Sequence, residues 1–298
     1  MKIYGKDVNV EGRLIRTARI DGERYCFVDD PELMLEGLRK CGTRIDLFTF
    51  MQKITETTPK YSYPMEWNNF AALPISNFDH WWTQQIDGKT RNMVRRSEKK
   101  GVVVREVCFD DALAKGIWEI YNESPVRQGR PFPHYGKDVE TIRRISATFM
   151  GTSIFIGAFL GERLIGFAKL TSNEDRSQAG VMHIVSMLQH RDKSPTNALI
   201  AQAVRSCAER KIPYLVYSNF AYGKKQRDSL SDFKERNGFS RIDLPRYYVP
   251  LTGLGRLALR LGLNHSFVDY VPEAVLVRFR EVRSAWYNRH LQSATGAS

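Results

Sequence analysis

The order of strand and helix patterns in the later two thirds of the chain is the feature that most constrains its fold. After Gly101 the 298-residue sequence reads as strand, helix, helix, three successive strands, helix, strand, helix and strand. Successive strands joined by short turns predict antiparallel neighbours, and the later strand–helix–strand step predicts a parallel crossover. We therefore expect an α/β fold with a mixed, mostly antiparallel central sheet and helices on both faces. A doubly wound parallel sheet would need strict alternation and is excluded.

The individual segments rest on residue type and spacing. The β-branched run Val102–Val107 indicates a strand, and the helical spacing of Leu113, Ile117 and Tyr121 indicates an amphipathic helix after Asp110. The same reasoning predicts strands at 102–107, 153–160, 163–171, 180–188, 212–218 and 246–251, and helices at 111–121, 137–150, 197–211 and 229–237. Three prolines and two glycines make residues 124–136 a loop.

Three domains are expected along the chain. Residues 1–66 are predicted to form a small N-terminal α+β subdomain, with strands at 14–20 and 24–28 and a helix from Asp30-Pro31. Residues 67–251 carry the main sheet, and 61–67 read as a connector rich in aromatic residues. Residues 252–298 are expected to be a C-terminal extension with helices at 253–262 and 272–290.

Composition limits the classes of partner and compartment. Lys and Arg number 45 against 33 Asp and Glu, a formal charge of +12, which favours an acidic partner such as nucleic acid, an anionic membrane face or a polyanionic cofactor. The longest apolar stretch is about eight residues against the ~20 that span a bilayer, and the N-terminus is polar from residue 5, so neither a membrane span nor a signal peptide is expected. Four cysteines without metal or redox spacing predict reduced thiols in the cytoplasm, and six histidines without a His-x-x-x-His pair predict no metal site.

A strongly basic helical segment precedes the main sheet. Arg95 with Lys99, and Arg96 with Lys100, are spaced to share a face, so the segment presents a positive strip. The strip could bind RNA phosphates, or its aliphatic stems could simply cover the core of an ordinary exposed helix.

Three segments in the right order resemble the GNAT acyltransferase superfamily over roughly residues 67–251. Glu162–Ala168 (ERLIGFA) looks like its third strand, and Phe233–Phe239 (FKERNGF) looks like its closing helix-Gly-Phe element. Lys89–Val102 is similar to the basic helix and strand of the Fem peptidyltransferases. The resemblance implies an N-acyltransferase that moves an acyl group from a thioester donor, such as acyl-CoA, to an amine of a small molecule, sugar or peptide.

The loop at residues 189–198 departs from the pattern of acyl-CoA users. Ser194 and Thr196 stand where that pattern has glycines for the pyrophosphate. The resemblance still assigns possible donor-binding groups, namely Arg191, Lys193, Ser194, Thr196, Asn197, Asn219 and Lys234. Two alternatives stay open: a Fem-like transferase that uses aminoacyl-tRNA to form an amide on a peptidoglycan or lipid-linked acceptor, and a catalytically silent GNAT-like module that binds a polyanion.

Candidate reacting groups follow from the expected sheet. His183 in a central strand could relay the proton of an amine, although a lone histidine there is often structural. Tyr217 and Tyr222, at and beyond the end of the following strand, are the other catalytic candidates. Lys234 stands where many acetyltransferases carry a tyrosine, and it could bind a phosphate or lie on a solvated face.

Two further segments are candidates for contact with substrate or membrane. The loop at 124–136 is expected to shape the acceptor site through Arg127, Arg130, His134 and Tyr135. The segment 253–263 is short, basic and apolar, so it could dock on a membrane surface, but packing against the core is the preferred interpretation.

Overall fold

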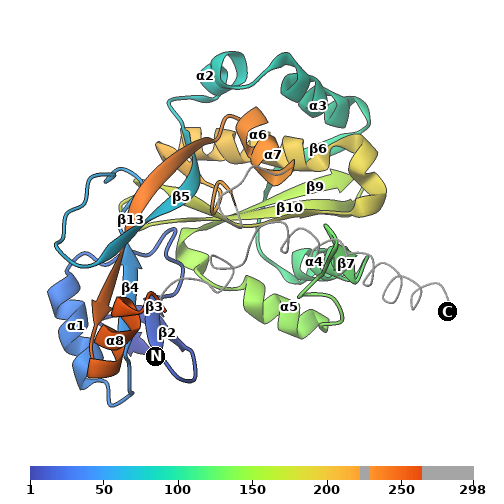
Figure 1. Ribbon diagram of the computed structural model, residues 1–298. Helices are drawn as coiled ribbons and strands as arrows, with labels where there is room; N and C mark the ends of the chain where they lie inside the picture. Colours follow the sequence, from blue (N-terminus) through green and yellow to red (C-terminus); the bar gives the residue numbers. More distant parts are fainter. Residues whose placement is uncertain (222–228, 264–298) are drawn as a thin grey trace. The chain divides into compact units, whose positions relative to one another are not determined.

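The computed structural model describes residues 1–221 and 229–263, which divide into two compact units (Figure 1). The first unit comprises 1–74, 172–180, 212–221 and 229–263, and the second comprises 75–171 and 181–211. This division differs from the expected boundaries at 66 and 251, because the strand that begins at Met65 pairs within the first unit. The expected helix at 272–290 lies outside the described residues.

The first unit is a twisted sheet with three helices. Its elements are β1 (Lys2–Ile3), β2 (Lys6–Glu11), β3 (Thr17–Ile20), α1 (Pro31–Lys40), β4 (Leu47–Met51), β5 (Met65–Pro74), β12 (Tyr214–Val216), α7 (Ser229–Arg236), β13 (Ser240–Pro250) and α8 (Gly253–Arg260). The strands are ordered β1-β2-β3-β4-β13-β5-β12, antiparallel except for the β3–β4 pair. Two residues, Ala179 and Gly180, add a short parallel pairing beside β12.

Aromatic packing holds the first unit together. The rings of Phe50 and Tyr247, on the paired strands β4 and β13, lie 5.2 Å apart between centroids, and Tyr61 meets Tyr247 edge-on at the same distance. The Tyr247 hydroxyl is buried, and it accepts a hydrogen bond from the Lys60 N–H at 2.8 Å. This hydrogen bond satisfies the phenol inside an apolar core, which an unpaired hydroxyl would destabilise.

The expected strands of this unit are only partly confirmed. Residues 24–28 form turns and no strand, while strands form at 6–11, 47–51 and 65–74 instead. The strand Met65–Pro74 begins inside the connector expected at 61–67, and its second half (Phe70 to Leu73) is buried between β13 and β12. The helix after Asp30 is confirmed, with the Asp30 carboxylate accepting the Leu33 N–H at 3.0 Å.

The second unit supplies most of the elements that the sequence predicts. They are α2 (Phe78–His80), the π-helical turn η1 (Trp81–Gln85), α3 (Gly88–Lys99), β6 (Val102–Val107), α4 (Asp111–Tyr121), β7 (Val126–Arg127), β8 (Arg130–Pro131), α5 (Val139–Ser146), η2 (Met150–Thr152), β9 (Ser153–Leu160), β10 (Arg163–Ser172), β11 (Ala179–Ser186), η3 (Leu188–Lys193) and α6 (Pro195–Glu209). The strand order is β11-β10-β9-β6, and β9 is antiparallel to both β6 and β10.

Helices cover both faces of the strands of the second unit (Figure 1). Figure 1 shows α6 and α3 above β6, β9 and β10, and α4 with α5 below them. Buried Leu199, Ile200 and Val204 fix α6 to the sheet. Gly116 lets α4 approach β10 closely, since a Cβ there would come within 2.8 Å of a Leu164 methyl group. The expected fold class, a mixed and mostly antiparallel sheet with helices on both faces, is confirmed.

Candidate functional site

Two histidines and a tyrosine from three segments of the second unit meet beside β11. The Tyr121 hydroxyl, at the end of α4, lies 3.4 Å from Nδ1 of His183 in β11. His134, from the loop after β8, stacks on the Tyr121 ring with centroids 4.5 Å apart and planes inclined by 18°. The His134 and His183 rings meet edge to face at 6.0 Å. The sequence predicts His183 as a catalytic group and His134 as a substrate contact, and the fold brings the two side chains together.

Burial sets the protonation state of two members of this cluster. Tyr121 is 1% exposed, and burial raises the pKa of its hydroxyl well above the ordinary value, so the phenol keeps its proton. Burial, followed by the charge of Lys137, lowers the pKa of His134. His134 is therefore an uncharged ring at neutral pH, and it can stack on a phenol or on a substrate without carrying a positive charge.

The cluster can support proton transfer at His183. If His183 Nδ1 carries the hydrogen and donates it to the Tyr121 oxygen, Nε2 is the basic nitrogen that can accept the proton of an amine. Phe167 of β10 and Phe132 of the loop pack around the pair, with Tyr121–Phe167 centroids 5.7 Å apart and Tyr121–Phe132 centroids 5.3 Å apart. These apolar rings fix the orientation of the tyrosine and the histidine.

Arg127 holds the loop to the sheet. Its guanidinium donates to the Ser186 carbonyl at 2.8 Å and the Ile120 carbonyl at 2.6 Å, and it pairs with Glu123 at 3.0 Å. Glu123 in turn accepts the backbone N–H groups of Leu188 and Gln189. Substrate contact by Arg127 stays a prediction, and in the structure these partners occupy its terminal nitrogens in a largely buried setting.

The other loop residues remain predictions as substrate contacts. Arg130 and Tyr135 lie on the same loop as His134, and both are exposed. Neither reaches the histidine pair through a hydrogen bond or ring contact in the described part of the chain. Their exposure is compatible with an acceptor passing over the loop.

The expected donor loop forms a tight turn before α6. Ser194 adopts a left-handed conformation with φ 53° and directly precedes Pro195, the first residue of the helix. The N–H groups of Ser194 and Asn197 donate to the carbonyls of Arg191 and Ser194, and the Thr196 hydroxyl bonds that of Ser186 at 2.9 Å. Lys193 pairs with Asp192, and Arg191 is exposed.

Three candidates from the first unit form a separate cluster. The Lys234 ammonium group is fully buried, donates to the Asn219 carbonyl and lies 4.9 Å from the centre of the Tyr217 ring. The expectation of a phosphate-binding or solvated Lys234 is corrected, since the side chain instead fastens α7 to the segment after β12. Tyr222 lies outside the described residues.

Two polar residues of the second unit, Glu123 and Lys169, have structural roles that were not predicted from the sequence. Glu123 follows α4 in a loop that otherwise reads as polar surface, and nothing local signals its buried ion pair. Lys169 lies in the apolar strand β10, is fully buried, and donates to the Ser146 carbonyl at 2.9 Å and the Thr148 hydroxyl at 3.0 Å. A lysine within an apolar strand was the available signal for such a group.

Sequence comparisons find no match to this chain, whereas comparisons of the fold find solved structures that resemble it. No protein-family model matches the chain, and no curated protein sequence matches it significantly. Among solved structures, the C-terminal domain (DUF2156) of an Agrobacterium fabrum protein assigned as a lysylphosphatidylglycerol synthetase is 13% identical, with a TM-score of 0.54 over 85% of this chain and 82% of its own. L-PGS from Bacillus licheniformis gives the same identity and TM-score, over 85% and 83%.

A further solved structure, FemX, is 13% identical with a TM-score of 0.47, over 74% of this chain and 69% of its own. At such identities the likeness shows the fold alone. The likeness to the two structures with a TM-score of 0.54 agrees with the fold class that the sequence predicts.

Proposed function

We propose that this protein is a GNAT-fold transferase that moves an aminoacyl group from aminoacyl-tRNA to an amine, with His183 as the proton acceptor. The contact that carries the proposal is the 3.4 Å approach of the Tyr121 hydroxyl to His183 Nδ1, with His134 stacked on the same tyrosine. General bases in enzymes are commonly histidines oriented by a second polar group.

The proposed reaction exchanges an ester for an amide. The uncharged amine attacks the carbonyl carbon of the aminoacyl ester, so a C–N bond forms and the C–O bond to the ribose breaks. His183 accepts the proton that the amine loses, and the departing ribose oxygen takes up a proton to become a hydroxyl. The pair of histidine and buried tyrosine supplies the proton path without a metal ion or redox partner.

The first turn of α6 favours an aminoacyl-tRNA donor over acyl-CoA. Pro195 has no N–H, and the N–H groups of Ser194, Asn197 and Ala198 already donate to backbone carbonyls. A pyrophosphate is normally held by several unpaired N–H groups at a glycine-rich helix start. The turn therefore offers few donors to coenzyme A, although Arg191 and Lys193 could still supply charge.

An acceptor at a membrane surface fits the shape of α8. The helix turns Gly255 and Ala258 inward and leaves Leu254, Leu257 and Leu261 exposed, by 39%, 51% and 60%. The preferred expectation, a helix packed against the core, holds for the face with Gly255 and Ala258, while the three leucines lie on the exposed face. Arg256 and Arg260 on the same short helix complement an anionic lipid surface.

A structural neighbour supports a lipid acceptor, and the free cysteines support a cytoplasmic location. One structural neighbour is assigned as a lysylphosphatidylglycerol synthetase, whose name denotes an aminoacylated lipid. We therefore propose that the acceptor is lipid-linked, the amine being what the proposed reaction requires, and that the protein contacts the membrane from the cytoplasmic side, for which four free thiols are suited. No helix in the part of the chain that the structure describes is long and apolar enough to cross a membrane.

The experiment that tests the function compares donors directly. The purified chain is incubated with a mixture of aminoacyl-tRNAs or with a panel of acyl-CoA thioesters, each with and without vesicles containing phosphatidylethanolamine as the amine acceptor. The expected result is acceptor-dependent loss of one or more aminoacyl esters and a lipid amide detected by mass spectrometry. Consumption of a thioester with the aminoacyl-tRNAs untouched would overturn the choice of donor. Salt-sensitive tRNA binding without any transfer would point to a silent polyanion-binding module instead.

A further inference from the structure

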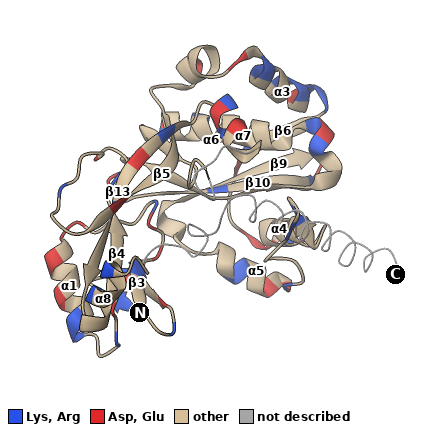
Figure 2. Ribbon diagram, viewed as in Figure 1, with Lys and Arg blue, Asp and Glu red and all other residues tan. Residues whose placement is uncertain are grey.

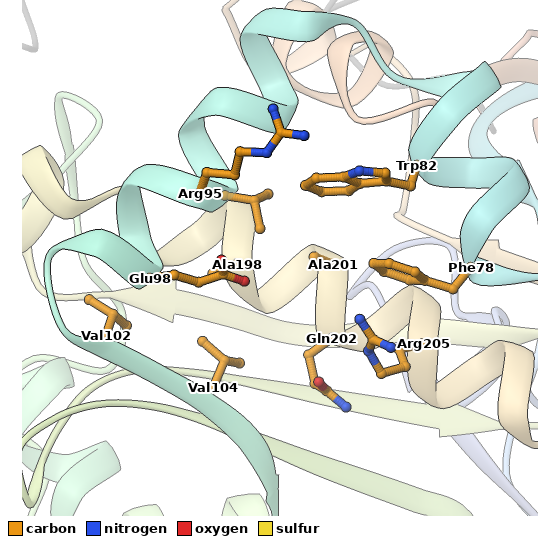
Figure 3. Close-up of a pocket in the computed structure, with 11 residues that line it drawn as sticks. Phe78, Trp82, Arg95, Glu98, Val102, Val104, Ala198, Ala201, Gln202 and Arg205 are labelled. Atoms are coloured by element: carbon orange, nitrogen blue, oxygen red, sulfur yellow. The ribbon is translucent and has the colours of Figure 1, made fainter.

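A pocket of about 340 Å³ lies between α3 and α6 in the second unit, away from the residues of the His183 cluster (Figure 3). Its volume is at the small end of the range for ligand sites, about 300 to 1,000 Å³. Val102 and Val104 of β6 supply apolar lining, and Glu98 and Gln202 supply a carboxylate and an amide. The pocket thus has room for one planar ring with polar groups at its edge.

Two aromatic rings and two guanidinium groups form a stack along the pocket. The Phe78 and Trp82 rings lie 5.9 Å apart between centroids, with planes inclined by 19°. The Arg95 guanidinium carbon lies 5.6 Å from the Trp82 ring centre, and that of Arg205 lies 4.0 Å from the Phe78 ring centre. Figure 3 shows these four side chains arranged around the open space. A guanidinium held over a ring keeps its N–H edges available for an anion.

The surrounding structure fixes the stack in place. Trp81 is fully buried, and its ring lies 5.5 Å from Phe78 and 6.0 Å from Trp82 between centroids. The Arg91 guanidinium donates to the carbonyls of Trp82 and Ile86 at 2.9 and 2.7 Å, which ties the π-helical turn to α3. The aromatic plates are therefore preorganised, and a ligand would lose little of its binding energy to ordering them.

The charge around the pocket is positive and largely unneutralised. Neither Arg95 nor Arg205 forms an ion pair with a carboxylate in residues 1–221 or 229–263. Arg96 and Lys99 extend the positive charge along the exposed face of α3, where Lys and Arg gather in Figure 2. Lys100 differs, because it pairs with Asp192 at 2.6 Å. The sequence predicts this positive strip, and the structure adds an aromatic pocket beside it.

We propose that this pocket binds an unpaired nucleotide of an RNA. The base packs against the part of the Trp82 ring that Phe78 does not cover, Gln202 and Glu98 contact its polar edge, and Arg95 and Arg205 bind the adjoining phosphates (Figure 3). Arg96 and Lys99 continue the contact along the RNA backbone. This assignment rests on the proposed function, since it names the surface that holds the RNA carrier of the donor.

The aromatic rings beside the cations favour RNA over an anionic membrane as the ligand of the pocket. A lipid surface would use the cations and the apolar lining, but it presents no planar ring to a pair of stacked aromatic side chains. Single-stranded nucleic acids are commonly bound by aromatic plates flanked by cations, and each stacked base contributes about 1–3 kcal/mol. The 340 Å³ pocket admits one such base.

The test measures whether the bases themselves are recognised. Fluorescence anisotropy reports the binding of a labelled, unpaired RNA of about eight nucleotides, a length within the usual site sizes, and of an abasic strand with the same number of phosphates. We expect the wild-type chain to bind the base-bearing strand about 10-fold more tightly, as one stacked base predicts. Trp82→Leu should remove this preference and leave binding of the abasic strand unchanged, while Trp82→Phe should retain the preference.

Two further variants separate charge from stacking. Arg95→Gln should weaken binding of both strands and reduce the slope of log Kd against log salt by about one, as one lost phosphate contact does. Lys115→Gln removes an exposed positive charge from α4, outside the stack, and should leave the preference unchanged. Equal binding of the two strands by the wild-type chain would overturn the proposal. Binding of anionic vesicles that depends on both Trp82 and Arg95 would overturn it in favour of a lipid surface.

The design keeps this inference separate from the proposed function. The RNA carries no aminoacyl group and no transfer is measured, so the base preference can be present even if aminoacyl-tRNA proves not to be the donor. Conversely, a folded Trp82→Leu chain could transfer aminoacyl groups normally and still prefer the base-bearing strand. That result would overturn the assignment of the pocket to RNA binding and would leave the transferase assignment intact. Thermal unfolding of each variant checks that the chain is folded.

Discussion

The hydroxyl of Tyr121 lies 3.4 Å from Nδ1 of His183, although the two residues are 62 positions apart in the sequence. The tyrosine ends helix α4 and the histidine lies within strand β11, on the second sheet. His134 stacks on the Tyr121 ring, with ring planes only 18° apart, and its own ring meets that of His183 edge to face. A histidine that could have been an ordinary packed residue is therefore part of a polar cluster.

We predict that His183→Ala lowers kcat for acyl transfer by about 100-fold or more, the loss typical of a general base. Tyr121→Phe keeps the ring that His134 stacks on and removes only the hydroxyl, so the expected loss is on the order of 10-fold, equivalent to one hydrogen bond. Single-turnover rates with each variant measure both effects. Tyr4→Phe removes an exposed hydroxyl elsewhere and should leave the rate unchanged. An undiminished rate in His183→Ala would show that the reacting groups lie elsewhere.

Arg127 and Glu123 give a prediction about stability. Arg127→Ala should lower the free energy of unfolding by about 3 kcal/mol, because it leaves a mostly buried carboxylate and two carbonyls without their donor. Arg127→Lys should recover little, since one ammonium group cannot reach all three acceptors. Urea unfolding provides the measurement. The control Arg143→Ala breaks an exposed pair with Asp111, for which a cost below about 1 kcal/mol is expected. Equal costs for the two alanine variants would contradict the bracing role.

Sequence reasoning succeeded where local chemistry decides the structure. The helix at 111–121 could be predicted because its N-cap, Asp110, and its apolar spacing are both local, and the Asp110 carboxylate does accept the Leu113 N–H at 2.7 Å. The strand at 65–74 was not predicted: its first three residues were interpreted as part of a connector at 61–67, and only pairing with distant β13 and β12 buries its second half. No residue near 65–74 in the sequence indicates that this segment pairs with β13.

The same distinction explains what was learned of the candidate site. His183 and His134 were predicted as site residues from residue type and position alone, and the sequence supports no more than that prediction. The roles of Arg127 and Lys234 could not be predicted, because their acceptors are backbone carbonyls of Ser186, Ile120 and Asn219 that the fold brings near. A carbonyl group is present at every position, so composition and spacing say nothing about which one a cation will meet.

Lys169 gives a prediction about pH. Burial lowers the pKa of Lys169 from its ordinary value near 10.5 to about 8. Between these values the unfolded chain still holds a proton that the folded chain has lost, so the folded state gains stability as the pH rises, by at most about 1.4 kcal/mol per pH unit. The wild-type free energy of unfolding minus that of Lys169→Met should therefore increase between pH 8 and 10, by on the order of 1–2 kcal/mol.

Using the difference between variants removes the contribution of other groups, including buried tyrosines whose raised pKa values act in the opposite direction at high pH. Chemical unfolding at several pH values supplies the free energies. Lys115→Met, which makes the same replacement at an exposed position of α4, is the matched control for the substitution itself. A flat difference for Lys169→Met would show that the lysine keeps an ordinary pKa in the folded chain.

The exposed leucines of α8 give the last prediction. Wild-type protein should co-sediment with vesicles containing phosphatidylglycerol more than with neutral phosphatidylcholine vesicles, because Arg256 and Arg260 lie on the same helix as the leucines. The double variant Leu257→Asp/Leu261→Asp should lower the partition coefficient by about 10-fold or more, since each leucine contributes roughly 1.5 kcal/mol or more when fully buried. Leu14→Asp, at a position that is 84% exposed on a loop, is the matched control and should have no effect. If all three proteins sediment equally with anionic vesicles, charge alone accounts for the contact and α8 is not the docking helix. If only the leucine variant loses sedimentation while soluble amine acceptors still react, α8 delivers the protein to a membrane-bound acceptor and takes no part in the chemistry.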